Sequence, residues 1–177
     1  MTETELYALL EQRGIAYETF HHKAVTTVAE ADKIVPRIAI ATKNLFLRDD
    51  KKRQFFVVVA DEHTNIDLKH LHKQLGSRRL SFASPEMLMD KLGLVQGSVT
   101  PFGILNDETR EVTLVIDETL AHQRFDAHPM VNTATMFIEM DDVLPLFQEH
   151  GNPVVFCDLT CQTGPALGSE GMTGGRA

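Results

Sequence analysis

The sequence has few cysteines, no long apolar run and no targeting segment. Its two cysteines, Cys157 and Cys161, are too few for a disulfide scaffold. Its longest apolar run, residues 55–60, is far shorter than the ~20 residues that span a membrane. The amino terminus is acidic at Glu3 and Glu5 and lacks the basic segment of a signal peptide. We therefore expect a cytoplasmic protein with reduced thiols and no contact with a membrane.

Motifs of common catalytic chemistry are also missing. The sequence has no Gly-x-Ser-x-Gly elbow of a serine hydrolase, and its loop at residues 97–103 lacks the Gly-Lys-Ser/Thr ending of a P-loop. The paired histidines do not have a recognisable zinc spacing, either at His21 and His22 or at His70 and His72. Neither cysteine lies in a segment that predicts an activated thiol. We expect no metal, no cofactor and no nucleophilic side chain.

Length and composition predict one globular domain. The chain has 177 residues and a mass of 19.8 kDa, with 43% hydrophobic and 24% charged residues. After residue 159 glycine becomes frequent and bulky apolar side chains become rare. We expect a domain over residues 1–159 and a flexible tail over residues 160–177.

Charge is distributed unevenly along the chain, whose net charge is −8. Residues 37–79 hold ten basic and five acidic side chains, so this stretch carries +5 and the rest of the chain −13. A basic segment on an acidic body could bring a phosphate backbone to one face and repel it elsewhere. The alternative is a solvated surface over which folding scatters these charges.

The pattern of apolar residues, caps and turns predicts an α+β (mixed α/β) fold, because helices and strands mix without strict βαβ order. We expect a helix where a capping box or a proline at the first turn precedes an apolar stripe. The expected helices are at residues 2–14, 28–35, 68–75, 85–92 and 141–150. The expected strands are at residues 15–20, 38–48, 54–60, 80–83, 102–105, 111–117, 125–128 and 135–139.

Two hairpins follow from these strands. Residues 49–53 form a charged turn between the second and third strands, and the turn region at Asn106 and Asp107 joins residues 102–105 to residues 111–117. Pro145 fits the last helix only if it lies in the first turn.

Lys43 is the one charged residue on its face of the strand at residues 38–48. Because side chains alternate across a strand, Lys43 shares a face with two alanines before it and two leucines after it. Its ammonium group either reaches solvent along the sheet or lies in a cleft. A lysine in a cleft is usually matched to an anion, since an unpaired buried ammonium is costly.

Two loops could contribute to a site. In residues 97–103 glycines and a proline surround small polar residues, so backbone amides there could bind an oxyanion or a carbonyl. Residues 128–135 are small and polar, and His128 could donate a hydrogen bond or transfer a proton. An ordinary connecting loop and a turn histidine are the alternatives.

Three segments together resemble the YbaK/prolyl-tRNA synthetase-associated family, namely residues 42–49, 92–103 and 128–135. The order and spacing agree over about residues 1–158. The resemblance implies an α+β editing domain with a mixed central sheet flanked by helices. It also implies an enzyme, a trans-acting aminoacyl-tRNA deacylase that hydrolyses the ester of a mischarged small amino acid, alanine above all, on tRNA(Pro). Cysteine or serine as the amino acid, a non-catalytic tRNA- or synthetase-binding module and a small-molecule hydrolase are the alternatives.

The resemblance also implies the site residues. Lys43 would hold the acceptor end of the tRNA through phosphate, Gly97 would belong to the loop that wraps the ester, and His128 would shape the amino-acid pocket. Further substrate-binding positions are implied at Asn44, Ser98, Val99, Thr100, Pro101, Phe102, Pro129, Asn132 and Thr133. The partners implied are the acceptor end of tRNA(Pro) and prolyl-tRNA synthetase. The family is thought to use the terminal ribose 2′-hydroxyl, which fits the missing triad.

Overall fold

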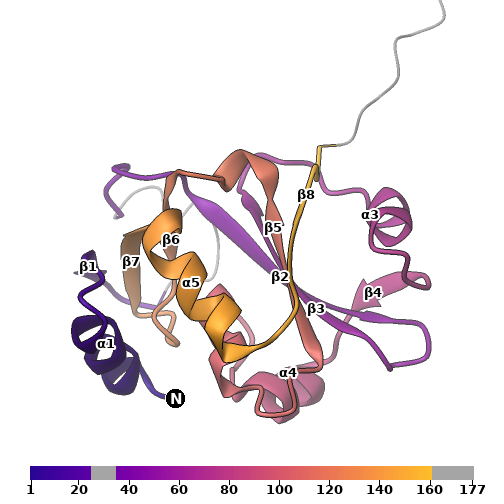
Figure 1. Cartoon of the computed structure of the whole chain (residues 1–177), viewed down its shortest axis with the longest axis horizontal. Helices are drawn as coiled ribbons and strands as arrows, with labels where there is room; N and C mark the ends of the chain where they lie inside the picture. Colours follow the sequence, from indigo (N-terminus) through magenta and orange to yellow (C-terminus); the bar gives the residue numbers. More distant parts are fainter. Residues whose placement is uncertain (25–34, 161–177) are drawn as a thin grey trace, which may run out of the picture.

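The structure is a computed structural model that describes residues 1–24 and 35–160, and it confirms the α+β class (Figure 1). It has a five-stranded mixed sheet in the order β4-β2-β3-β5-β8 and a second, three-stranded antiparallel sheet in the order β1-β7-β6. The larger sheet comprises β4 (Leu80–Phe82), β2 (Thr42–Asp49), β3 (Phe55–Asp61), β5 (Val112–Asp117) and β8 (Val154–Cys157). The smaller sheet comprises β1 (Tyr17–His21), β7 (Ala134–Glu139) and β6 (Arg124–Ala127).

The first predicted hairpin is confirmed. β2 and β3 are antiparallel, with Arg48 opposite Phe55 at the turn and Lys43 opposite Ala60 at the far end. The Asp49 carboxylate accepts hydrogen bonds from the backbone N–H of Arg53 at 2.7 Å and of Gln54 at 3.2 Å. The charged turn is therefore held by an aspartate that is buried.

The second predicted hairpin is wrong. Residues 101–106 form the 3₁₀ helix η1 (Pro101–Asn106), and β5 lies parallel to β3 on one side and to β8 on the other. β8 was not predicted. Parallel pairing joins segments that are far apart in the sequence, so no local turn signals it. Five of the six β5 residues are buried, as expected for a strand inside a covered sheet.

A short seam joins the two sheets. The predicted strand at residues 38–48 begins only at Thr42, and Ile40 before it makes a parallel bridge to Phe125 of β6. The Ile40 N–H donates to the Arg124 carbonyl at 2.9 Å, and the Asp126 N–H donates to the Ile40 carbonyl at 3.0 Å. The start of β2 is thereby fixed beside β6.

The first helix and the helix after Ser84 begin where the capping signals predict, whereas the last helix begins at Met140, one residue before the predicted Asp141, and has no side-chain cap hydrogen bond. Thr2 and Glu5 form a reciprocal capping box, and the Ser84 hydroxyl accepts from the Met87 N–H at 3.3 Å. The described helices are α1 (Glu3–Gln12), α3 (Leu68–Gln74), α4 (Pro85–Leu92) and α5 (Met140–His150), with a 3₁₀ turn η2 (Glu118–Leu120). The helix predicted at residues 28–35 falls almost wholly on residues 25–34, outside the described part, as does the predicted tail from residue 161.

Pro145 is placed differently from the expectation. It is the sixth residue of α5 and not part of its first turn. A proline there leaves the Asp141 carbonyl without a helical partner. Because Asp141 and Pro145 are both exposed, water can take the place of that partner.

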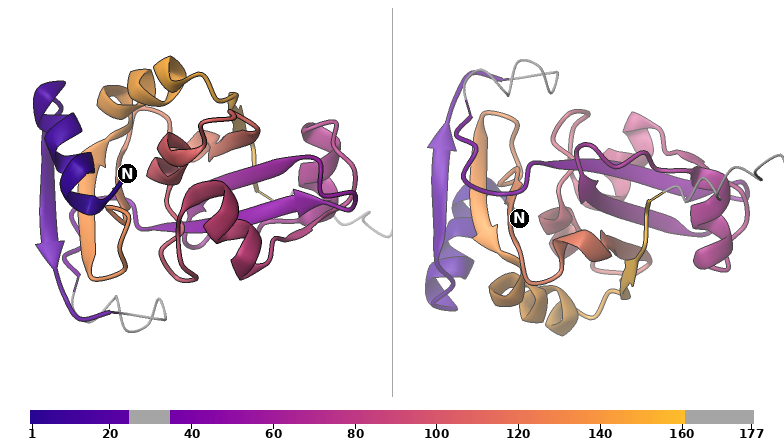
Figure 2. Two further views of the ribbon diagram at one scale, coloured as in Figure 1. Left: turned by 90° about the horizontal axis from the view of Figure 1, so that it is seen from below. Right: turned by 90° about the horizontal axis from the view of Figure 1, so that it is seen from above.

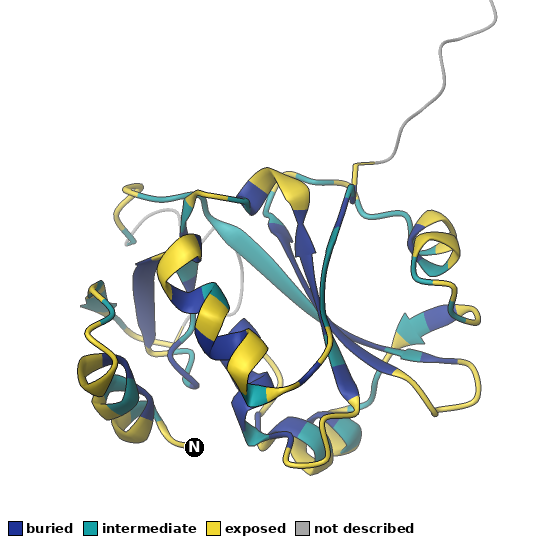
Figure 3. Ribbon diagram, in the orientation of Figure 1, coloured by how far each residue is buried: buried dark blue, intermediate teal, exposed yellow. Residues whose placement is uncertain are grey.

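Two apolar clusters cover the two faces of the larger sheet. Its middle strands β3 and β5 are almost wholly buried (Figure 3). The larger cluster joins both sheets with α1, α4 and α5, and the smaller lies beneath α3. Figure 2 shows α1 and the smaller sheet at one end of the molecule, with α3, β4 and the β2–β3 turn at the other. Among the described residues, no helix has the length and apolar character needed to cross a membrane.

Candidate functional site

A cavity of about 510 Å³ lies beside the seam between the two sheets. The longer segments that border it are residues 35–46 leading into β2, the end of β6, the loop at residues 96–99, and the connection from β4 to α4. Glu62 after β3 and Thr135 of β7 border it as single residues. A cavity of this size is within the ordinary range for small-ligand sites. The bordering segments come from all along the chain, so only the folded protein forms it.

The three residues expected to form the centre of the site share this cavity. Lys43 from β2, Gly97 from the loop and His128 at the end of β6 all line it. Asn44 and Val99, two of the expected substrate-binding residues, line it as well.

The Lys43 ammonium group is held by the backbone. Its Nζ donates to the Glu62 carbonyl at 3.1 Å and to the Thr64 carbonyl. Within residues 1–24 and 35–160 it forms no ion pair with a carboxylate. An ammonium has three donors, so one N–H of Lys43 remains for a ligand. The side chain is partly buried beside the cavity, in agreement with the cleft interpretation.

The backbone of the loop is suited to binding an oxygen atom. Gly97 has φ +88°, a left-handed conformation that a side chain would strain. In the described part of the chain, the N–H groups of Gly97 and Val99 donate to no acceptor. The Ser98 hydroxyl instead donates to the Val95 carbonyl at 2.8 Å and holds the turn. Two backbone donors beside the cavity are therefore unused.

His128 is poised as a hydrogen-bond acceptor. Its Nδ1 lies 3.2 Å from the Ala134 carbonyl, and since a carbonyl only accepts, Nδ1 carries the proton. Burial lowers the pKa of His128, and the nearby His22 lowers it further. The imidazole is therefore neutral at pH 7, with a lone pair on Nε2. No described residue donates a hydrogen bond to Nε2.

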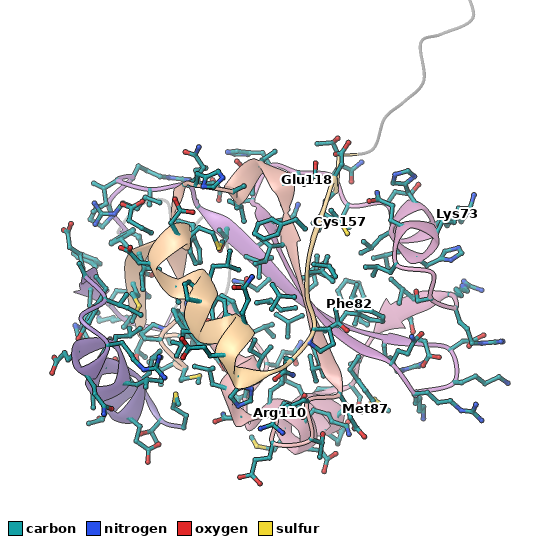
Figure 4. All side chains as sticks on the ribbon, in the orientation of Figure 1. Lys73, Phe82, Met87, Arg110, Glu118 and Cys157 are labelled. Atoms are coloured by element: carbon teal, nitrogen blue, oxygen red, sulfur yellow. The ribbon has the colours of Figure 1, made fainter. Side chains whose placement is uncertain are left out.

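Two cavity features were missed at the sequence level. His22 accepts at Nε2 from the Thr135 hydroxyl at 2.9 Å, while its Nδ1 donates to the Lys23 carbonyl at 2.8 Å. Thr135 lines the cavity, so His22 orients a cavity hydroxyl from behind. Phe82, labelled in Figure 4, is 62% exposed on β4 and also lines the cavity. The sequence signal for His22 is the pair of adjacent histidines, whose spacing does not match a zinc site.

Carboxylates also border the cavity and were not expected there. Asp126 of β6 accepts from the Thr42 N–H at 2.6 Å, and the Glu62 side chain is only 6% exposed and pairs with Arg37. Burial raises the pKa of Asp126 to about 6. The negative charge of Glu62 adds to this rise, against hydrogen bonds from Thr42 and the charge of Arg37.

The remaining expected residues do not line the cavity. Thr100, Pro101 and Phe102 are buried, and the Phe102 ring packs against Phe147 with centroids 5.6 Å apart. They lie beneath the loop and support it. The others outside the lining are Ser98, Pro129, Asn132 and Thr133.

Asn132 nevertheless lies close to the loop, since a Cβ added at Gly97 would be 3.8 Å from its Nδ2. In the described ranges, no group of three or more His, Cys, Asp or Glu side chains could hold a metal ion.

Solved structures share this fold. One, described as a candidate trans-editing enzyme for prolyl tRNA synthetase, has a TM-score of 0.67 at 20% identity and covers 89% of this chain and 96% of that one. A second, the hypothetical protein APE2540, has a TM-score of 0.65 at 18% identity and covers 87% of this chain and 97% of that one. At these identities the likeness defines the fold class alone.

The family follows from the sequence comparisons. The profile of the aminoacyl-tRNA editing domain matches residues 21–146, and the chain belongs to this family. It is 43% identical over 147 residues to the prolyl-tRNA editing protein ProX of Acetoanaerobium sticklandii, covering 82% of this chain and 90% of that one. It is 37% identical over 149 residues to prolyl-tRNA synthetase associated domain-containing protein 1 of Danio rerio, covering 82% of this chain and 80% of that one. The predicted resemblance is confirmed.

Proposed function

We propose that this protein is a trans-acting aminoacyl-tRNA deacylase that hydrolyses a mischarged small amino acid, alanine above all, from tRNA(Pro). The observation that carries the proposal is that Lys43, Gly97 and His128 border the same cavity in a chain of the editing family. The relative ProX, a prolyl-tRNA editing protein by name, supports prolyl-tRNA as the substrate. The domain assigned to this activity is residues 1–159.

The reaction needs no nucleophilic side chain, because an aminoacyl ester is already activated. A water molecule adds to the ester carbonyl, and the tetrahedral oxyanion collapses to release the free amino acid and the terminal ribose hydroxyl. The unused N–H groups of Gly97 and Val99 are suited to the oxyanion. The lone pair of His128 is suited to orient the water or the neighbouring ribose hydroxyl.

Lys43 is assigned to the phosphate at the tRNA end. Its two carbonyl partners hold the ammonium at the cavity, and its remaining N–H is available to an anion. The family resemblance assigns the same role to this residue. Selectivity for the small amino acid would come from steric exclusion of proline, because the larger proline ring clashes in a pocket that accepts an alanine methyl group.

The basic residues of the stretch at residues 37–79 provide a second support. The β2–β3 turn, α3 and β4 lie together at one end of the molecule (Figure 2). Lys51, Lys52 and Arg53 of the turn are exposed there, and Arg78 beside β4 is paired with Asp50 at 2.5 Å. This end is suited to the tRNA backbone, with prolyl-tRNA synthetase as a further partner to be tested.

The test is a deacylation panel with alanyl-, cysteinyl-, seryl- and prolyl-tRNA(Pro). We expect rapid loss of the alanyl ester and persistence of the prolyl ester. Lys43→Ala should abolish hydrolysis without lowering the melting temperature substantially. The matched control is Lys91→Ala, which removes an α4 lysine paired with Glu111 at 2.6 Å, away from the cavity lining. If the wild-type protein cleaves no small-amino-acid ester, the proposal is wrong.

A further inference from the structure

Asp126 is a cavity carboxylate to which the proposed hydrolysis assigns no role. The seam places it, because its own N–H donates to the Ile40 carbonyl and its Oδ1 accepts from the Thr42 N–H at 2.6 Å. The Thr42 hydroxyl also donates to the Asp126 carbonyl at 2.8 Å. Three hydrogen bonds thus fix the residue at the cavity, so its carboxylate has a defined position.

The second carboxylate oxygen of Asp126 is unused. In the part of the chain that the structure describes, Oδ2 accepts no hydrogen bond and Asp126 forms no ion pair. The other cavity carboxylate, Glu62, differs because it already has Arg37 as its cation. The Lys43 ammonium bonds to backbone carbonyls and not to either carboxylate. Among the described residues, Asp126 therefore has no cation at ion-pair distance, although the charge of Arg37 acts on it from farther away.

Asn44 provides a second, independent observation. It lines the same cavity from β2, and its Oδ1 is buried without any hydrogen-bond partner among the described residues. A buried polar atom without a partner is uncommon and indicates a missing ligand or solvent molecule. Two acceptors, from β2 and β6, are thus unsatisfied in one cavity. Both would be satisfied by a small cationic donor.

The ligand class that matches these acceptors is a primary ammonium. An ammonium has three N–H donors, and its hydrogen bonds to a carboxylate are stronger than neutral ones. An aminoacyl ester carries one such group on its α-carbon, next to the bond to be cleaved. An amino acid linked through its amine, or a hydroxy acid, has no such group.

We infer that Asp126 binds the α-ammonium group of the aminoacyl ester, with the Asn44 amide as the second acceptor. This inference rests on the proposed deacylase function and adds a specificity element to it. The site would then recognise two features of the substrate. It would select the small side chain by sterically excluding larger ones, and it would bind the free amine through its charge. It would reject esters of the same size that lack the amine.

The test compares two esters on the same tRNA, alanyl-tRNA(Pro) and lactyl-tRNA(Pro), in which a hydroxyl replaces the α-amine. Values of kcat/KM are corrected for spontaneous hydrolysis. We expect the wild-type protein to prefer the alanyl ester by about tenfold or more, the usual worth of a charged hydrogen bond. Asp126→Asn retains an oxygen for the Thr42 N–H but removes the charge. It should lower the alanyl rate by that factor and leave the lactyl rate within about twofold.

Glu62→Gln is the matched control, because it removes the other cavity charge, which Arg37 already pairs. It should leave the ratio of alanyl to lactyl rates unchanged. If Asp126→Asn slows both esters equally, or if only Glu62→Gln removes the preference, the inference is wrong. Hydrolysis of neither ester by the wild-type protein would refute the proposed function itself, and the inference with it.

A second measurement follows the pH dependence of the ratio of alanyl to lactyl rates. The α-amine of the ester itself gains a proton between about pH 8 and 7, so the series runs from about pH 6.5 down to 4.5. The wild-type ratio should fall over this range, because Asp126 becomes protonated there. His128, Lys43, Glu62 and Arg37 also border the cavity, and a change in the charge of any of them would act on the ammonium more than on the lactyl hydroxyl. The same series on Asp126→Asn should therefore show no fall. A wild-type ratio that does not fall, or a fall of the same size in Asp126→Asn, would overturn the inference.

Discussion

Asp126→Asn should stabilise the protein at neutral pH, because the native fold holds this carboxylate where ionisation is costly. Burial raises its pKa from 3.8 to about 6, and the charge of Glu62 contributes to this rise. A carboxyl whose pKa is higher in the folded than in the unfolded state lowers stability when it ionises. This loss of folding free energy is fully present above about pH 6 and disappears as pH falls toward 4.

The magnitude follows from the size of the rise. Each pKa unit corresponds to 1.36 kcal/mol, so ionised Asp126 costs about 3 kcal/mol at pH 7.5. Asparagine avoids that cost and still offers an oxygen to the Thr42 N–H. For a domain of this size, 1 kcal/mol shifts the melting temperature by about 2–4 °C, which predicts a rise of about 6–12 °C at pH 7.5. The difference should shrink toward zero near pH 4.

The assay is thermal unfolding of both proteins at pH 4, 5, 6 and 7.5. The difference between them is measured because other carboxylates titrate in both. Asp49→Asn is the control: Asp49 is also buried, but its carboxylate accepts two N–H bonds in the β2–β3 turn. This variant should gain no stability at any pH. A melting difference for Asp126→Asn that does not vary with pH, or a variant less stable than wild type at pH 7.5, would refute the reasoning.

Two further predictions concern the loop and the basic turn. Gly97→Ala and Gly14→Ala both place alanine in a left-handed backbone conformation without a steric clash. Each should lower the free energy of unfolding by about 1–2 kcal/mol. Only Gly97→Ala should lose deacylation activity. Equal activity of the two variants, measured beside their melting temperatures, would remove the loop from the site. Replacing both Lys51 and Arg53 with serine should raise KM for the tRNA without changing kcat. The slope of log KM against log salt concentration should fall by about 0.7–0.9 for each phosphate that the turn no longer neutralises. An unchanged slope would show that this turn does not bind tRNA.

Local signals predicted local structure well. The capping box at Thr2 and Glu5, the Ser84 cap and the charged turn after β2 each depend on residues only a few positions apart. Their hydrogen bonds form wherever those few residues fold, so the sequence suffices to predict them.

Long-range pairing was not predictable in the same way. β5 pairs in parallel with β3 and with β8, and both pairs join segments that are distant in the sequence. The strand β8 was not predicted, and residues 101–106 form a 3₁₀ helix where a strand was expected. A short apolar segment does not specify its partner, because the free energy of pairing depends on what lies beside it. The seam at Ile40 was missed for the same reason.

The amino-acid sequence by itself determined the fold class and the family, and it predicted the residues at the centre of the candidate site. It could do so because Lys43, Gly97 and His128 each belong to a recognisable local segment. Only the tertiary structure decided that they share one cavity and that the Lys43 ammonium rests on backbone carbonyls. It also decided that Asp126 lies there and forms no ion pair within the described residues. Burial and electrostatic pairing depend on groups that the chain brings together from distant positions, and no short motif encodes them.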